Sequence, residues 1–171
     1  MTDSYFVSLA RYNAWANRRL YDACAHLPEA EYMKPRPAFF GSLHGTLNHI
    51  LVADRIWLTR ITHKPNPSLT LDQILYGDLV ALRVAREAED DHIVNVVAAV
   101  SERALDQPLA YATTTGARQQ TPLRIVLAHF FNHQTHHRGQ AHGLLSQTAV
   151  APPPLDLIYF MRETAAAAAS G

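Results

Sequence analysis

Histidine is concentrated in one segment of this chain, and its spacing there is that of a metal-binding pair. Five of the ten histidines lie between residues 129 and 142. On a helical wheel, His133 and His137 fall within one apolar stripe, one turn apart. Two imidazoles at this spacing have Cβ atoms about 6 Å apart, so both rings can bind one ion. The pair indicates a divalent metal site, although two histidines packed in a core would give the same pattern.

The other histidines of this segment fit the apolar stripe less well. His129 and His136 lie at its edge, and His142 points to the opposite side of the wheel. Because His136 is adjacent to His137 and three residues from His133, it is the main alternative ligand.

A catalytic metal site usually has three protein ligands and one open position, so a third ligand must come from another helix. Helical periodicity does not choose it, although His49 has more apolar neighbours on its own side than His44. Asp54 is more simply interpreted as a structural carboxylate paired with an arginine. The candidates that remain open are His26, His44, His49, His92 and Asp54.

Four long helical segments must position these side chains. Apolar residues recur at three-or-four spacing, while proline and glycine interrupt the stretches between. Ser42 and Asp78 are suitable N-caps, and Thr121 followed by Pro122 is a good helix start. The predicted helices span residues 3–26, 42–63, 78–105 and 121–147.

Two shorter elements complete the prediction. Residues 108–120 alternate β-prone residues around Gly116, which favours a short β-hairpin before the last long helix. A short C-terminal helix is expected from residue 155. Long helices with apolar stripes bury those stripes most economically against one another, so we expect an all-α fold built as a four-helix bundle.

Composition limits the class of protein. A chain of 171 residues, 48% hydrophobic and 18% charged, is expected to form one globular domain over residues 1–171. Fifteen basic residues balance fifteen acidic ones, so we expect no nucleic-acid partner. No apolar run reaches the ~20 residues of a membrane span. Cys24, the single cysteine, is expected to be a small core residue, and the absence of a signal-peptide pattern indicates a cytoplasmic protein.

Three motifs resemble those of the DinB-like family, also called DinB/YfiT-like. They are YNAWANRRL at residues 12–20, LNHI at residues 47–50 with Asp54 and Trp57 after it, and NHQTHHRGQ at residues 132–140. The resemblance spans nearly the whole chain and implies a four-helix bundle with an up-down-down-up course. It also implies one metal ion held by His49, His133 and His137.

The resemblance implies a divalent-metal-dependent enzyme, with zinc or nickel as the expected metal. Similar proteins include bacterial thiol transferases and mycothiol-dependent isomerases. A metal ion held by three neutral imidazoles can activate a thiol or water, giving S-transfer or hydrolysis on a small molecule. A low-molecular-weight thiol is therefore an expected partner. The alternatives are a non-catalytic metal- or ligand-binding module of the same fold and a structural bundle whose histidines only pack.

Five further residues carry expectations about their surroundings. Asn13, Asp54 and Gln140 are candidates to orient the ligand rings through their second nitrogens, although Asn13 and Gln140, each taken alone, are more simply interpreted as helix-surface amides. On the wheel, Arg138 points away from the metal face, so we expect it to form a structural ion pair. Phe131 lies off the apolar stripe, which predicts an exposed ring and a possible homodimer contact.

Overall fold

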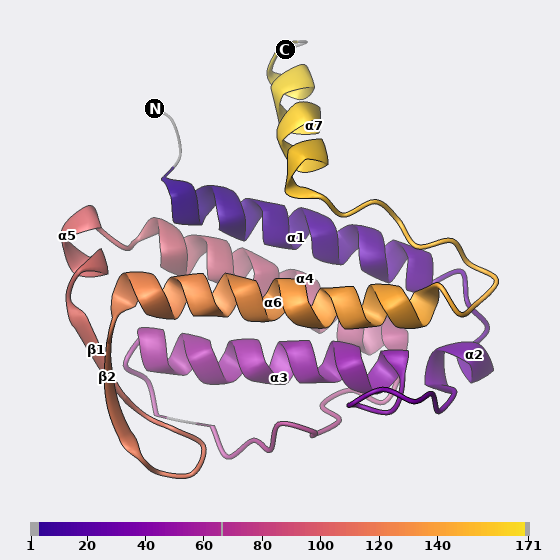
Figure 1. Cartoon of the computed structure of the whole chain (residues 1–171), viewed down its shortest axis with the longest axis horizontal. Helices are drawn as coiled ribbons and strands as arrows, with labels where there is room; N and C mark the ends of the chain where they lie inside the picture. Colours follow the sequence, from indigo (N-terminus) through magenta and orange to yellow (C-terminus); the bar gives the residue numbers. More distant parts are fainter. Residues whose placement is uncertain (1–3, 66, 170–171) are drawn as a thin grey trace.

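The computed structural model describes residues 4–65 and 67–169, in which four long helices lie side by side (Figure 1). Helix α1 packs against α4 and α6, and α3 packs against the same two helices. The four are α1 (Tyr5–Cys24), α3 (Leu43–Ile61), α4 (Leu79–Ala98) and α6 (Leu123–Leu145). The predicted helical fold class is confirmed.

The long connection after α3 sets the direction of the helices. It returns along the length of the molecule before α4 begins, so α3 and α4 run parallel to each other and opposite to α1 and α6 (Figure 1). The order of directions is therefore the up-down-down-up course that the family resemblance implies. No helix among the described residues is both long and apolar enough to cross a membrane.

Side-chain caps fix where three of the four long helices start. Ser42 accepts a hydrogen bond from the amide of Gly45, and Asp78 accepts one from the amide of Ala81. Both caps are as predicted. Each side-chain oxygen accepts a hydrogen bond from an amide that has no partner within the helix. Ser4 does the same for α1.

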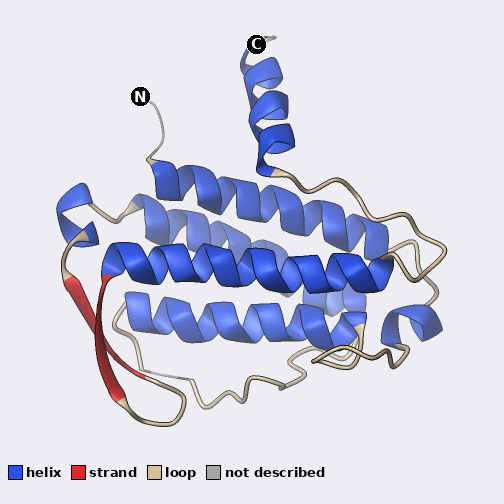
Figure 2. Ribbon diagram, viewed as in Figure 1, coloured by secondary structure: helices blue, strands red, loops and turns tan. Residues whose placement is uncertain are grey.

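The β-hairpin before the last long helix is present (Figure 2). Strands β1 (Pro108–Ala112) and β2 (Arg118–Pro122) pair antiparallel, and Gly116 turns the chain with a φ of 86°. Pro122 is the last residue of β2 and lies opposite Pro108, the first residue of β1. The prediction that Pro122 lies inside the helix is therefore wrong, because α6 begins one residue later.

Three helical details differ from the predicted boundaries or add to them. The helix predicted over residues 78–105 ends at Ala98, and Ser101 caps a separate helix, α5 (Glu102–Leu105). A short helix that was not predicted, α2 (Glu29–Met33), precedes α3. The predicted C-terminal helix is α7 (Leu157–Ala169), which is mostly exposed and buries Phe160 against α1.

Phe131 lies in the core, so the prediction of an exposed ring at this position is wrong. Its side chain is 6% exposed and stacks on Phe6 of α1, with 6.5 Å between ring centroids. Helix α6 is contacted by α1 as well as by α3, and Phe131 lies on the side that faces α1. This ring is therefore not available as a dimer contact.

Cys24 is a core residue, as predicted, and we expect it to be unreactive in the folded chain. It is fully buried, and burial raises the pKa of its thiol to about 12. Because the thiolate is the reactive form, iodoacetamide at pH 8 should leave native Cys24 unmodified and should alkylate it in guanidinium chloride. Mass spectrometry of the two samples checks this. Full alkylation of the native chain would contradict the buried position.

His63 holds a backbone conformation that favours glycine. Its φ is 54°, and it follows α3 at the position where the amides of His63 and Lys64 return to the carbonyls of Arg60 and Thr59. This is the Schellman arrangement, in which glycine avoids the cost of a left-handed residue. We expect His63→Gly to raise the free energy of unfolding by about 1 kcal/mol, measured in urea. Thr62→Gly, at a neighbouring negative φ, should lower it instead; equal losses in both variants would contradict the assignment.

Candidate metal centre

Three histidines from two helices converge on one point between α3 and α6. The Nε2 atom of His137 lies 3.2 Å from Nε2 of His49 and 3.1 Å from Nε2 of His133. One ligand atom from each residue lies within 4.8 Å of the other two. The structure therefore brings together the three positions that the family resemblance selected, close enough to hold one metal ion.

The helices explain why these side chains meet. His133 and His137 are one turn apart on α6, so their rings project from the same side of the helix. Helix α3 runs antiparallel to α6 beside it (Figure 1) and presents His49 opposite that pair. His49 and His137 are buried, whereas His133 is half-buried.

Hydrogen bonds at the far side of two rings fix which nitrogen carries the proton. Nδ1 of His49 lies 2.7 Å from the carbonyl oxygen of Leu71, which can only accept. Nδ1 of His137 lies 2.8 Å from Oε1 of Gln140. Both Nδ1 atoms therefore donate, which leaves both Nε2 atoms unprotonated in the neutral rings. Gln140 thus has the orienting position that was predicted for it.

Burial keeps these rings neutral at ordinary pH. It lowers the pKa of His49 to about 4 and, together with the neighbouring histidines, lowers that of His133 to about 3. Burial also lowers the pKa of His137. Neutral imidazole is the form that binds metals, so the three residues are in the ligating state.

The arrangement fits a divalent cation on the chemistry of its donors. The Nε2 lone pairs of His49 and His137 face each other at 3.2 Å with no proton between them. Two such lone pairs repel in a buried place, and a cation between them would remove that repulsion. Three imidazole nitrogens suit zinc, nickel and other transition metals rather than magnesium or calcium.

An aromatic side chain that the sequence analysis missed covers this site. Phe40 stacks on His49 with 3.8 Å between ring centroids and meets His137 edge-on at 5.6 Å. Its loop passes so close to the start of α3 that a Cβ atom at Gly45 would overlap the carbonyl oxygen of Phe40. Gly45 thus allows the loop to place an apolar wall beside the histidines.

The other predicted candidates lie apart from the three-histidine group. His44 contacts the Tyr32 hydroxyl, His26 contacts the carbonyl of Asp22, and His92 pairs with Glu89. His136 is exposed and accepts a hydrogen bond from Nε2 of Gln140. None of these four joins the group among the described residues.

Asp54 belongs instead to a buried ion-pair network that crosses from α3 to α4. Arg86 bonds Asp54 at 2.5 Å and pairs with Asp90 at 3.1 Å, and all three side chains are almost fully buried. Burial raises the pKa of both carboxyls, and Arg86 opposes that rise. The interpretation of Asp54 as a carboxylate paired with an arginine is confirmed, and Asp54 does not orient a ligand ring.

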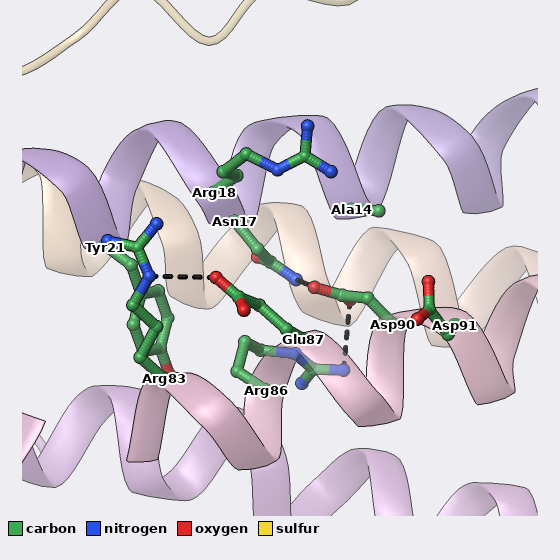
Figure 3. A pocket seen from close by; sticks show the side chains of 9 residues that line it. All are labelled: Ala14, Asn17, Arg18, Tyr21, Arg83, Arg86, Glu87, Asp90 and Asp91. Atoms are coloured by element: carbon green, nitrogen blue, oxygen red, sulfur yellow. Dashed lines mark hydrogen bonds and ion pairs between the residues drawn. The ribbon is translucent and has the colours of Figure 1, made fainter. Parts of the chain in front are cut away.

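The same network continues to α1 and α6 and corrects two predictions. Asn17 donates to Asp90 beside a cavity of about 260 Å³ (Figure 3), and Asn13 also donates to Asp90. Arg138 is buried and donates to the amide oxygens of Asn13 and Asn17. Asn13 therefore orients Arg138 rather than a histidine. The ion pair predicted for Arg138 is not found within the described part of the chain, because its guanidinium donates to the amide oxygens of Asn13 and Asn17 and to the hydroxyl of Thr135.

Gln140 provides a test of how the second nitrogen of His137 is held. Gln140→Leu removes the acceptor of the Nδ1 proton, and we expect metal affinity to fall by about 10- to 100-fold. Gln140→Glu keeps an acceptor there and should retain the affinity. A competition titration against a coloured chelator measures both. Equal affinity in Gln140→Leu and the wild type would show that this hydrogen bond does not tune the site.

The fold and the site together define a class: mainly helical proteins with a candidate three-histidine metal centre between two antiparallel helices. Comparison with known proteins makes the class specific. A sequence profile of the DinB family matches residues 1–168, so the chain belongs to the DinB family.

Individual relatives agree with this assignment. Protein DinB of Bacillus subtilis (strain 168) is 28% identical over 175 residues, which cover 96% of this chain and 98% of the relative. A crystal structure of a DinB-like protein from Bacillus cereus ATCC 10987 has a TM-score of 0.66 at 18% identity, over 87% of this chain and 94% of that one. A second, from Bacillus subtilis, has a TM-score of 0.58 at 16% identity, over 86% and 97%. At these identities the two structures establish the fold alone.

Proposed function

We propose that this chain is a divalent-metal-dependent enzyme that acts on a small molecule, with His49, His133 and His137 as the metal ligands. The observation that carries the proposal is the contact between the Nε2 atoms of His49 and His137. Both nitrogens are unprotonated because both Nδ1 atoms donate elsewhere, so the contact calls for a cation.

Three protein donors favour catalysis over a purely structural metal. Structural zinc sites usually have four protein ligands, whereas catalytic sites have three and keep one position for water or substrate. Among the described residues, no fourth histidine, cysteine or carboxylate joins the group. A metal ion held by these three rings would therefore keep a position for water or a small molecule.

The expected chemistry is transfer or hydrolysis. A divalent ion held there would lower the pKa of a thiol or a water molecule enough to give a nucleophile at neutral pH. The chain's own residues then have simple tasks. Leu71 and Gln140 accept the Nδ1 protons of His49 and His137, which leaves the Nε2 lone pairs of both neutral rings available to a metal ion. Phe40 limits the access of water beside these rings. A low-molecular-weight thiol attacking an electrophile is the reaction that the proposal favours, and zinc or nickel is the expected metal.

The reaction class can be tested with purified, untagged protein loaded with zinc or nickel. One assay supplies a low-molecular-weight thiol with 1-chloro-2,4-dinitrobenzene, and a second supplies p-nitrophenyl acetate for hydrolysis. We expect turnover above that of His137→Ala in one of them. A loaded protein no faster than this variant in either assay would overturn the transferase and hydrolase proposals for these substrates. Stoichiometric metal without turnover would favour the non-catalytic binding module.

A further inference from the structure

A second polar cavity lies at the C-terminal end of α3, away from the three histidines. Its volume is about 270 Å³, it is open to solvent, and it is lined by the end of α3 on one side and by β1 on the other. Three of its lining residues are Arg60, His63 and Lys64, and no acidic residue lines it among those that the structure describes. A concave surface whose ionisable basic groups have no acidic counterpart attracts an anion.

Arg60 is held in this cavity by stacking rather than by an acid. Its guanidinium lies 4.5 Å from the centroid of the Trp57 ring and 5.4 Å from that of Tyr111. Its Nε and Nη2 atoms are buried and have no hydrogen-bond acceptor within the described part of the chain. Stacking on the ring faces leaves the N–H groups at the edge of the guanidinium without an acceptor. Such a planar set of N–H donors matches the oxygens of a carboxylate or phosphate.

The end of α3 does not itself need these cations. Positive side chains near a helix C-terminus often serve the free carbonyls of the last turn. Here the amides of Thr62, His63 and Lys64 already bond the carbonyls of Leu58, Arg60 and Thr59. The helix dipole thus accounts for positive charge in this region, but not for buried N–H groups that lack an acceptor.

The backbone conformation of His63 also indicates a functional site here. This residue keeps an imidazole at a position with a φ of 54°, where glycine would be less strained. A strained position that carries a polar side chain is often part of a functional site.

From these observations we infer that the cavity between α3 and β1 is a binding site for the oxyanion group of a small molecule, a carboxylate or a phosphate. Arg60 supplies the planar guanidinium, and Lys64 and His63 supply further positive or hydrogen-bond-donating groups beside it. The inference does not depend on the proposed metal-dependent function. About three turns of α3, roughly 16 Å, separate Arg60 from His49, so the two sites are distinct.

Aromatic contacts connect the two sites. Trp57 meets the ring of His129 with 5.0 Å between centroids, and His129 lies 5.8 Å from His133 by the same measure. The wall behind Arg60 is therefore shared with the surroundings of the histidine site. A molecule anchored by its anionic group in the cavity would lie beside this wall.

The test is a titration of ¹⁵N-labelled, metal-free full chain with inorganic phosphate and, separately, with acetate. Ionic strength is held constant with sodium chloride so that only specific binding changes the spectrum. We expect saturable shifts at the Arg60 Nε signal and at the amides of His63, Lys64 and Tyr111. The anion with the lower Kd identifies the phosphate or the carboxylate class.

Variants decide whether the cavity is responsible. Lys64→Gln and Arg60→Gln should each weaken binding about tenfold. His63→Gly should weaken it without destabilising the fold. Arg118→Gln removes an equal charge from the neighbouring strand and should bind like the wild type. Shifts that do not saturate with either anion, or equal weakening in Lys64→Gln and Arg118→Gln, would overturn the inference. Because Lys64 is exposed, its variant remains informative if Arg60→Gln does not fold.

Discussion

Replacing His137 with alanine should reduce the affinity of the chain for a divalent metal by more than about 100-fold. This residue lies between the other two histidines, with Nε2 within 3.2 Å of each. Loss of a direct ligand costs more than loss of an orienting partner, for which 10- to 100-fold is usual. Elemental analysis of untagged protein should find about one metal ion per wild-type chain and far less in the variant.

The matched control is His136→Ala, on the same helix and one residue away. His136 is exposed and bonded to Gln140, so its loss should leave the metal content nearly unchanged. His49→Ala and His133→Ala should behave like His137→Ala. Full retention of metal in all three variants would contradict the proposed ligand set. Loss of metal from His136→Ala alone would indicate a site on the exposed side of α6.

A separate effect is expected on the metal-free protein. Without a cation, the lone pairs of His49 and His137 repel across 3.2 Å. His49→Ala removes that repulsion but also leaves a cavity, so the two effects oppose each other. The metal-dependent rise in the melting temperature should therefore disappear from the variant, whatever its metal-free stability. Thermal unfolding with and without zinc measures this difference.

The histidine pair on α6 could be predicted from the sequence because the spacing of apolar residues shows which side of this helix faces the core. His133 and His137 share a stripe with residues such as Val126 and Phe130, and the structure places both near the centre between α3 and α6. The choice of His49 needed the family resemblance. The reason is physical: every residue from 43 to 54 is buried, so α3 has no polar side there against which His49 could be distinguished.

The wrong predictions on α6 have a single cause. One apolar stripe was assumed to face one neighbour, whereas α6 contacts both α3 and α1. Phe131 and Arg138 face α1, where Phe131 stacks on Phe6 and Arg138 bonds Asn13. A helix buried on two sides has a wider core face than a single stripe indicates.

The position of Phe40 could not be predicted because it depends on tertiary contact. The ring reaches His49 through a loop whose course requires the missing Cβ at Gly45. No local pattern of residues records that close approach. The same is true of Pro122, where pairing with β1 overrides the preference of proline for the first helical position.

Replacing Arg86 with methionine should destabilise the fold by about 3–5 kcal/mol. Methionine keeps an unbranched apolar side chain at this position but lacks the guanidinium, so Asp54 and Asp90 are left buried without their cation. Such a loss costs far more than the net contribution of the intact pair, because an unpaired charge in the interior keeps its full desolvation penalty. Urea unfolding at pH 7 measures the change. Arg83→Met, on the same helix, breaks ion pairs of more exposed side chains and should cost at most about 1 kcal/mol.

The pH dependence of this loss distinguishes an electrostatic cause from a packing defect. Burial already raises the pKa of Asp54 and Asp90, and removing Arg86 takes away the largest opposing effect. A carboxyl whose pKa is higher in the folded state than in the unfolded state contributes stability at low pH and loses it as pH rises through the folded pKa. The difference between Arg86→Met and the wild type should therefore be smaller at pH 4 than at pH 7. A deficit that is equal at both values would mean that shape, and not the buried charge, sets the cost. Adding Asp54→Asn and Asp90→Asn to the variant should then recover part of the stability at pH 7 only if the charges are responsible.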